Sequence, residues 1–350
     1  MEGDPGSKAV PPQAVVRPGV ACLLCHTTDG WEPALQAVTD LKYGVEGTWD
    51  YLRCSGCGLV VLHPIRPGAG PDGYPAAYRQ HTSSGPGPAE PVAAGNRVRR
   101  YLRRRALAGM GYTETGPAPG PPSLLDRVWA GVPPVRVGAQ WGCLLVPRAR
   151  AGGRLLDVGC GNGRFLVLMR ALGWEGSGVE PDPRSAALAS DHGLEVAPSL
   201  GEARRPPGGF DVVTMNHVVE HLADPVAELL EIRRLCAPGG LVGIATPNWA
   251  ALTRRLLGRH WYALEPPRHV VLFTARTLRA TVEAAGFRVV SSATRSVREG
   301  AVAWRLGLAY RRGRPWPRLA LAAGTAVSLA TAPLGGGEEI ELWATPSADG

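Results

Sequence analysis

A cluster of glycines at residues 155–165 constrains the fold of this chain more than any other feature. The stretch reads LLDVGCGNGRF: an apolar run ends in an acid, and Gly159, Gly161 and Gly163 follow at alternate positions. A turn this tight needs residues without a Cβ, both for positive φ angles and so that a ligand can lie against the main chain. Because apolar residues resume at Phe165, the pattern predicts a strand, a ligand-binding turn and the start of a helix.

The spacing of these glycines distinguishes between two classes of cofactor. A dinucleotide-binding turn has the spacing G-x-G-x-x-G, which would place its third glycine at position 164. That position is Arg164, and the run here is G-x-G-x-G, with Asp157 two residues before it. This pattern resembles motif I of the class I S-adenosylmethionine (SAM) methyltransferases. The resemblance implies SAM as the cofactor, with Asp157 orienting the turn and meeting the amino-acid end of SAM.

Strands and helices alternate after the glycine turn. A second strand ends in Glu180, whose carboxylate suits the two hydroxyls of a ribose. Residues 210–215 have the pattern of a buried strand, and we include Asn216, directly after it, among the cofactor-binding residues. A helix-like stretch at 225–235 is broken by Pro-Gly-Gly before a short apolar strand at 241–245. This order predicts an α/β fold with a Rossmann-like, doubly wound parallel sheet and helices on both faces.

Four of the seven cysteines are organised in two CxxC pairs. Cys22 and Cys25 form the first pair, and Cys54 and Cys57 form the second. Such pairs are typical of a zinc site in a cytosolic chain, because four thiolates complete a tetrahedral shell. A redox dithiol or ordinary turn cysteines would not explain two pairs. We therefore expect a zinc ribbon over residues 21–66, in which a structural Zn²⁺ leaves no coordination position open for catalysis.

The composition does not by itself indicate a macromolecular partner. The 350-residue chain has a net charge of +8, but arginine carries nearly all of the positive charge. Abundant Ala, Gly, Pro and Arg together are typical of genomic codon bias, so we discount the basic balance as a sign of nucleic-acid binding. The N-terminus has no apolar signal core, and the longest apolar stretch, 319–334, is too short for a bilayer span. These features predict a cytoplasmic protein.

The chain divides into four segments on composition and pattern. They are a disordered, Pro/Gly-rich N-terminus (1–20), the zinc ribbon (21–66), a linker and helical cap (67–150) and the SAM-dependent methyltransferase domain (151–345). Within the third segment, residues 96–112 predict a basic amphipathic helix. A solvated face is its ordinary role, and contact with an acidic carrier or a membrane surface is the alternative. A second helical stretch is expected at about 123–149.

A long, aromatic segment follows the strand at 241–245. Residues 246–273 carry several aromatic, proline and histidine residues, and a connection of this length is usually a functional loop or lid. A helix at 275–285 and a strand at 287–291 come next. The final strand, 339–344, is expected to pair with the latter at the edge of the sheet. A helix near 317–332 shows no sign of a functional site.

Taken whole, residues 20–345 resemble bacterial methyltransferases with an N-terminal cysteine-rich zinc module. The shared motifs are CxxC…CxxCGLV…HP, LLDVGCG, EHL followed by DP, TPN, PPRH and a late GGE. The resemblance implies a SAM-dependent methyltransferase (EC 2.1.1.-) acting at oxygen or carbon of a sugar, a nucleotide-linked sugar or another secondary metabolite. Sugar C-methyltransferases carry a Glu-His pair in the lid where this chain has Arg268-His269, which departs from their mechanism.

Three histidines are candidates for a catalytic base. Methyl transfer from a sulfonium is an in-line displacement, in which the protein mainly positions the methyl group and excludes water. A hydroxyl or C–H acceptor also needs a base. His217 and His221 follow the strand at 210–215, and His269 lies in the expected lid, so all three can reach the crevice at the carboxyl ends of the strands. His269 is our first choice, and a structural, hydrogen-bonded histidine is the alternative for each.

Residues 217–221 also match the pattern H-x-x-E-H, which is typical of a class of zinc hydrolases. The match follows a strand of a nucleotide-binding fold immediately, and no third ligand is evident on a downstream helix. We therefore do not assign a catalytic metal to it.

Two further function classes stay open at this point. The first is a tRNA or rRNA methyltransferase whose zinc ribbon holds RNA, although the ribbon contains only Lys42, Arg53 and Arg66 as cations. The second is a non-enzymatic SAM-fold binding protein, against which the intact Asp157 and Glu180 count. The expected partner is a small-molecule acceptor, free or linked to a nucleotide or carrier, rather than nucleic acid. The pattern does not give the oligomeric state.

Overall fold

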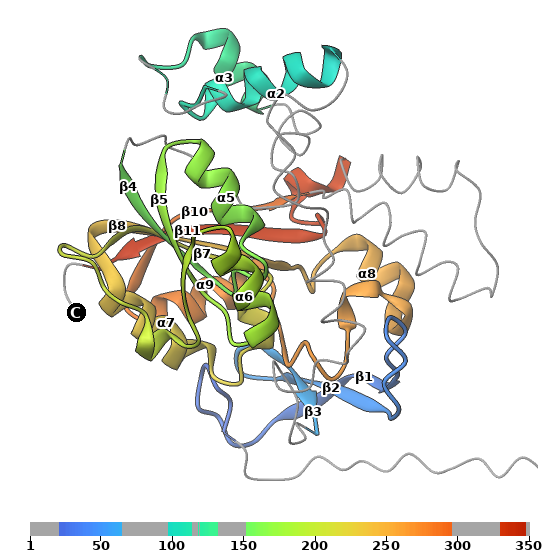
Figure 1. Ribbon diagram of the computed structural model, residues 1–350. Helices are drawn as coiled ribbons and strands as arrows, with labels where there is room; N and C mark the ends of the chain where they lie inside the picture. The colour runs from blue at the N-terminus through green and yellow to red at the C-terminus, as the bar shows by residue number, and fades with distance from the viewer. Residues whose placement is uncertain are drawn as a thin grey trace, which may run out of the picture.

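A seven-stranded sheet forms the centre of the protein in the computed structural model (Figure 1). The structure describes residues 21–64, 97–113, 118, 120–131, 152–295 and 330–347. The expected disordered segment 1–20, most of the stretch 123–149 and most of the helix near 317–332 therefore lie outside the described residues. Within the described ranges, no helix has the length and apolar character needed to cross a membrane. The cytoplasmic location stays a prediction.

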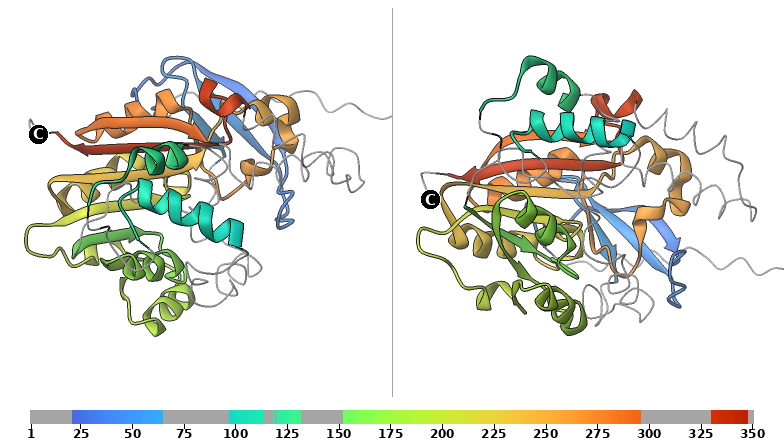
Figure 2. Two further views of the ribbon diagram at one scale, coloured as in Figure 1. Left: turned by 90° about the horizontal axis from the view of Figure 1, so that it is seen from above. Right: turned by 45° about the horizontal axis from the view of Figure 1, so that its top comes forward.

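The order of the strands confirms the predicted doubly wound α/β sheet. In spatial order they are β10 (Phe287–Arg295), β11 (Glu339–Pro346), β8 (Cys236–Pro247), β7 (Phe210–Asn216), β4 (Gly153–Val158), β5 (Trp174–Val179) and β6 (Glu195–Ala197). Six strands run in one direction, and β11 runs antiparallel between β8 and β10. The expected pairing of 339–344 with 287–291 at the edge of the sheet is confirmed, and Figure 2 shows these orange and red strands opposite the green ones.

One boundary differs from the expectation. The preceding helix ends at Leu235, and the Pro-Gly-Gly sequence at 238–240, expected to break it, lies inside β8, which begins at Cys236. The register between β7 and β8 shifts at this point: Phe210 pairs with Cys236, whereas Val212 pairs with Leu241. The residues that the sequence pattern assigns to a break between helix and strand therefore form a β-bulge within β8.

Helices cover both faces of the sheet. They are α5 (Arg164–Ala171), α6 (Pro183–Asp191), α7 (Pro225–Leu235), α8 (Leu252–Leu257) and α9 (Ala275–Ala284), with short 3₁₀ turns η2 (Leu200–Glu202), η3 (Val219–His221), η4 (Gly258–His260), η5 (Tyr262–Leu264) and η6 (Ala332–Leu334). Successive strand residues face opposite sides: Leu155 packs in the cluster with α5 and α6, and Leu156 packs in the cluster with α7 and α9. Both faces of the sheet are thus buried, as in other parallel sheets.

Local capping explains where these helices begin. Asp182 caps α6 and Asp224 caps α7, each accepting backbone N–H groups of the first turn, and a proline follows each at the first helical position. Thr274 starts α9 with a capping box. The DP sequence recognised at 224–225 is therefore a helix start.

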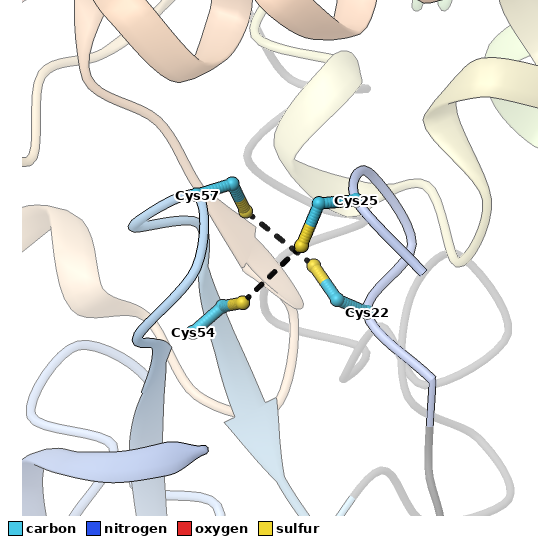
Figure 3. Close-up of side chains that lie close together, drawn as sticks. All are labelled: Cys22, Cys25, Cys54 and Cys57. Atoms are coloured by element: carbon cyan, nitrogen blue, oxygen red, sulfur yellow. Dashed lines mark hydrogen bonds between the residues drawn. The ribbon is translucent and has the colours of Figure 1, made fainter. Parts of the chain in front are cut away.

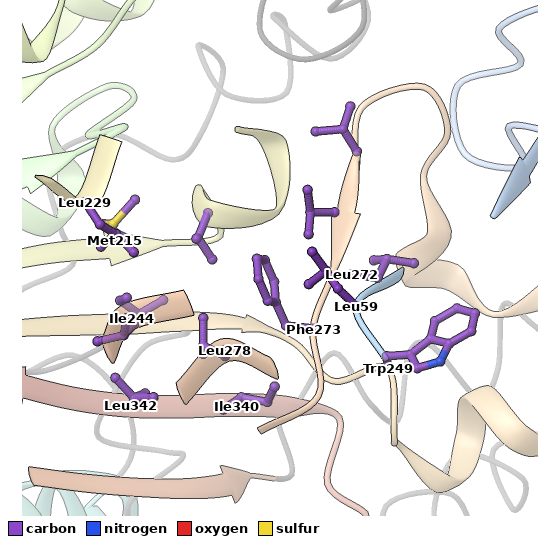
Figure 4. Close-up of a cluster of buried hydrophobic side chains, with 14 of the residues drawn as sticks. Leu59, Met215, Leu229, Ile244, Trp249, Leu272, Phe273, Leu278, Ile340 and Leu342 are labelled. Atoms are coloured by element: carbon purple, nitrogen blue, oxygen red, sulfur yellow. The ribbon is translucent and has the colours of Figure 1, made fainter. Parts of the chain in front are cut away.

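The segment expected as a zinc ribbon is a small antiparallel sheet that includes one strand, β9, from the larger domain. Its strands are β1 (Trp31–Val38), β2 (Trp49–Cys54), β3 (Val60–His63) and β9 (Val271–Leu272). Leu59 of the ribbon lies in the same buried cluster as Leu272, Trp249 and the sheet residue Ile244 (Figure 4). The ribbon therefore shares its core with the domain that it precedes, and Figure 1 shows it in blue below the large sheet.

The expected lid, residues 246–273, is a folded insertion that we call the lid segment. It contains α8, η4, η5 and β9. An isolated bridge between Asn248 and Phe273 closes its two ends, and the Asn248 side-chain amide donates to the carbonyls of Gly335 and Gly337. The segment is thereby tied to the C-terminal strand as well as to the ribbon.

The predicted helix at 96–112 is present as α2 (Arg97–Gly109), next to α3 (Leu124–Gly131). Leu107 is buried, and Trp174 of β5 donates its indole N–H to the Tyr112 hydroxyl at 2.8 Å just after the helix. The helix thus docks on the face of the sheet opposite the ribbon (Figure 1). Contact of its basic residues with a carrier or membrane stays a prediction.

Candidate functional site

The glycine turn has the geometry that the sequence predicts. Gly159, Gly161 and Gly163 have φ angles of +70°, +55° and +76°. A Cβ on Gly159 would lie 2.5 Å from the Val218 side chain, and one on Gly163 would lie 2.4 Å from Leu194. A Cβ on Gly161 would meet no described atom within 4 Å. Two of the glycines thus permit close packing, while the third faces open space where a ligand can approach the backbone.

Glu180 fastens the open glycine to the end of β5. Its carboxylate accepts hydrogen bonds from the backbone N–H of Gly161 at 2.8 Å and from that of Asp182 at 2.9 Å. Partial burial raises the pKa of this carboxyl group. The acid therefore lies beside the turn, as expected for a ribose-binding residue, and its contact with SAM stays a prediction.

Asp157 lies below the turn, inside the sheet. It is 3% exposed, and its Oδ1 accepts a hydrogen bond from the Thr214 hydroxyl at 2.6 Å. Burial raises the pKa of Asp157 to about 7, against the opposing effect of hydrogen bonds from Thr214 and Asn216. Asp157 and Asn216, assigned separately from the sequence, are thus brought together at the ends of β4 and β7.

His217 is held between two carboxylates. Its Nδ1 lies 3.2 Å from Glu220 Oε1, and its Nε2 lies 2.9 Å from Glu339 Oε2. Burial alone would lower the pKa of His217, but these two bonds raise it well above the usual value. The side chain is 40% exposed, so water screens the attraction without reversing its direction. A histidine that is already protonated cannot act as a general base, and this geometry favours His217 as a fixed positive charge.

His221 and His269 form a buried pair beside it. The two rings are T-shaped with centroids 4.7 Å apart, and each residue is 5% exposed. His221 Nδ1 lies 3.0 Å from the Arg268 carbonyl, and His269 Nδ1 lies 2.8 Å from the Ala263 carbonyl. Since a carbonyl oxygen can only accept, each Nδ1 carries the proton.

The charge states of this pair follow from its burial. Burial, together with the neighbouring His269, lowers the pKa of His221 to about 4, and burial also lowers the pKa of His269. Both imidazoles are therefore neutral near pH 7, with Nε2 as the basic nitrogen. The structure brings two of the three candidate bases together in the protonation state that a base requires.

Glu220 connects the three histidines. Burial alone would raise the pKa of Glu220, but the His217 contact lowers it to about 2. Its Oε2 also accepts a hydrogen bond from the Thr246 hydroxyl at 2.8 Å. For Glu220, His221 and His269, one side-chain nitrogen or oxygen atom of each lies within 4.8 Å of those of the other two. A third residue with a metal-ligand side chain therefore does lie beside the H-x-x-E-H residues, but it comes from the lid segment and not from a helix. Because Glu220 and both Nδ1 atoms are already hydrogen-bonded, we interpret the group as a proton-transfer cluster.

Sequence reasoning did not identify the partner of Arg268. The side chain is fully buried, and its guanidinium donates to both oxygens of Asp40 at 2.9 and 3.0 Å. Since Arg268 is engaged with the ribbon, the departure from a Glu-His pair has a structural explanation. No local pattern could have paired residues so far apart in the chain.

The four ribbon cysteines converge as the sequence predicts (Figure 3). The Sγ atoms of Cys22 and Cys57 are 3.5 Å apart, as are those of Cys25 and Cys54, and all four lie within 4.8 Å of one another. Four thiolates bound to one tetrahedral Zn²⁺ at about 2.3 Å lie about 3.8 Å apart. The cluster therefore fits a structural zinc ion and offers no further ligand position.

Comparison with known proteins finds matches to the central part of the chain. The family model for a methyltransferase domain matches residues 139–292. A ubiquinone biosynthesis O-methyltransferase of Cereibacter sphaeroides is 36% identical over 127 residues, which are 34% of this chain and 51% of that protein. The enzyme of the same name from Xanthomonas oryzae is 34% identical over 128 residues, which are 34% of this chain and 54% of that protein. The chain spans about half the length of the curated relatives it matches.

Among solved structures, two methyltransferases align with part of the chain. A SAM-dependent methyltransferase of Archaeoglobus fulgidus aligns with a TM-score of 0.38 at 21% identity, over 55% of this chain and 86% of that one. A phosphoethanolamine N-methyltransferase of Haemonchus contortus aligns with a TM-score of 0.38 at 17% identity, over 57% of this chain and 49% of that one.

Removal of zinc should unfold the ribbon. Zinc binding to small cysteine sites supplies roughly 10–16 kcal/mol, which is comparable to the whole stability of a domain. We expect one zinc per chain by metal analysis, and loss of both the metal and the ribbon's strand signal in Cys54→Ser. Cys236→Ala, at a buried cysteine outside the cluster, should retain the metal. A zinc-free protein whose ribbon stays folded would contradict the assignment.

The glycine turn yields a matched pair of variants. In Gly163→Ala the new Cβ meets packed side chains at positive φ, so the free energy of unfolding should fall by about 2–4 kcal/mol. In Gly161→Ala only the backbone cost of about 1–2 kcal/mol for an alanine at positive φ applies, but the methyl group enters the open space. Calorimetry should therefore show at least tenfold weaker SAM binding with a nearly normal melting temperature. Unchanged SAM affinity in Gly161→Ala would place the cofactor elsewhere.

The buried histidine pair predicts loss of stability in mild acid. Below about pH 6.5 the unfolded chain binds protons at His221 and His269, whereas the folded chain does not until the pH approaches the lowered pKa of about 4 for His221. The free energy of unfolding should fall by up to about 1.4 kcal/mol per pH unit for each histidine. The raised pKa of His217 instead stabilises the folded state. This stabilisation is fully present below pH 6.5 and is lost only as the pH rises. Urea unfolding at pH values between 6.5 and 5.5 gives the free energy of unfolding as a function of pH. We expect this free energy to change less steeply with pH in His221→Asn than in wild type, and as steeply as in wild type in His192→Asn. Equal slopes in all three proteins would show that the pair is not buried neutral.

Proposed function

We propose that the protein transfers a methyl group from SAM to a hydroxyl oxygen of a small-molecule acceptor, since a methyltransferase-domain family model matches residues 139–292. The observation that carries this proposal is the juxtaposition of two features at one edge of the sheet. An open glycine turn bordered by Glu180 lies on β4 and β5, and a buried pair of neutral imidazoles follows β7. Val218 connects them, because it packs against Gly159.

The residues present fit SAM. Gly161 leaves room for the cofactor against the main chain, and the Glu180 carboxylate lies beside it to accept the ribose hydroxyls. Asp157 and Asn216 lie at the same end of the sheet for the amino-acid portion. When bound, SAM supplies an electrophilic methyl group on a sulfonium.

His269 is the proposed base. Its Nδ1–H donates to the Ala263 carbonyl, so Nε2 is directed to accept a proton from an acceptor hydroxyl. His221 has the same tautomer and is the second choice, or the residue that orients the acceptor. The charged His217 would instead fix Glu220 and through it the turn that carries His221.

Two observations support a small hydroxyl acceptor over the alternatives. The curated relatives described above are named as O-methyltransferases, and the lid segment has Arg268 where sugar C-methyltransferases carry a glutamate. For an RNA substrate, the ribbon would need free cations. Lys42 is instead paired with Glu265 at 2.5 Å, which leaves Arg53 as the other cation of the described ribbon residues.

The proposal is tested by methyl transfer from labelled SAM to phenols, nucleotide sugars and RNA, followed by His269→Ala on the acceptor that reacts. We expect a small hydroxyl compound to be labelled. Loss of a positioned base lowers turnover by about 10²–10⁴-fold, so His269→Ala should lose turnover on this scale while SAM affinity and melting temperature stay close to wild type.

His192→Ala, at a histidine remote from the pair, serves as the control and should keep full turnover. Labelling of RNA alone would favour the second function class, and a protein that does not bind SAM would contradict the proposal. Near-normal turnover in His269→Ala would move the base to His221.

A further inference from the structure

We propose that Asp40 of the zinc ribbon is a positioning residue for methyl transfer: through Arg268 it fixes the lid backbone that holds the imidazoles of His221 and His269. This inference rests on the proposed function for its catalytic meaning. The residues involved are far apart in the sequence, and the pairing of β3 with β9 brings them together.

The contact between Asp40 and Arg268 is rigid. Both side chains are fully buried, and the guanidinium donates to the two carboxylate oxygens at 2.9 and 3.0 Å. The carboxylate also accepts backbone N–H groups of Lys42 and Val45 at 3.1 and 3.2 Å, so it is fixed from the ribbon side. A planar fork paired with a carboxylate in two bonds defines orientation as well as distance.

A second ion pair holds the neighbouring turn. Lys42 lies 2.5 Å from Glu265 Oε1, and Arg268 Nε lies 3.5 Å from Glu265 Oε2. Glu265 has a φ of +39°, which is unfavourable for a residue with a Cβ. Such a conformation persists only where surrounding contacts enforce it, and here two cations bind the side chain.

A third contact comes from the ribbon strand β2. The buried Tyr51 hydroxyl lies 2.5 Å from the Leu264 carbonyl and 3.2 Å from the His269 carbonyl. Trp249 packs near the Tyr51 ring, with centroids 6.3 Å apart. Ribbon side chains thus contact the lid segment at the Glu265 and Arg268 side chains and at the carbonyls of Leu264 and His269.

This backbone is what orients the two imidazoles. The Arg268 carbonyl accepts the Nδ1–H of His221, and the Ala263 carbonyl accepts that of His269. In addition, the Val270 N–H donates to the Glu220 carbonyl at 2.8 Å. A shift of Arg268 would therefore displace the acceptor of one imidazole and the neighbour of the other at the same time.

A purely stabilising role explains these contacts less well. Desolvation of two charges offsets most of their attraction, so a buried ion pair is a weak source of net stability. The ion pair does supply a fixed position for the backbone at Arg268, and a displacement of this backbone would misdirect the proposed base. General-base catalysis depends on placing the nitrogen within hydrogen-bonding reach of the acceptor proton.

The test uses the full chain with three variants: Asp40→Asn, Arg268→Lys, and Asp126→Asn as a control that breaks the Arg105–Asp126 ion pair between α2 and α3. Nitrogen-15 NMR of labelled histidine reports the tautomer of each imidazole. In wild type and the control, His221 and His269 should be Nδ1–H tautomers, whereas Asp40→Asn and Arg268→Lys should show mixed tautomers. Turnover in these two variants should fall at least tenfold, with SAM affinity within twofold of wild type and one zinc per chain retained.

Each outcome has a distinct meaning. Wild-type tautomers in Asp40→Asn would overturn the positioning role, whatever the activity. Joint loss of zinc, SAM affinity and turnover in both variants would also overturn it, because that result marks a structural role. Absence of methyl transfer by the wild-type protein would instead contradict the proposed function, which the NMR measurement does not require.

Discussion

The absence of a Cβ at Gly159 is the constraint on which the arrangement of the site depends. Because no side chain intervenes, Val218 packs directly onto the cofactor turn, where a Cβ would lie 2.5 Å from it. Val218 precedes η3, so this contact brings the turn with His221 up against the strand end that carries the glycines. The lack of a side chain at Gly159 thus joins the proposed cofactor-binding turn to the proposed proton-transfer residues.

The three histidines have two different charge states because their surroundings differ. His217 lies between two carboxylates and is held charged, while His221 and His269 face each other and backbone carbonyls and are held neutral. Glu220 contacts the charged histidine and neutralises it locally, so the neutral pair does not face an unbalanced cation. Opposite shifts of pKa in adjacent groups are a common arrangement of acid–base sites.

Local patterns predicted the glycine turn, the strand ends and the cysteine cluster, because each depends on residues close in sequence or on a ligand set with strict spacing. The same reasoning named His217 as one of three candidate bases without predicting its carboxylate partners, and it did not find the partner of Arg268. Both points depend on contacts over long sequence separations, with Glu339 and Asp40 respectively. The strand β9 was also missed, since two residues carry too little pattern to be distinguished from loop.

The bridge between Asn248 and Phe273 has a consequence for how molecules enter and leave. Both ends of the lid segment meet at this bridge, and the Asn248 amide anchors them to Gly335 and Gly337 beside β11. The two ends are therefore held beside each other, and ribbon side chains hold the stretch between residues 264 and 269. If these contacts persist during the proposed reaction, acceptor and product would pass around the lid segment, and turnover would not depend on the opening of a gate.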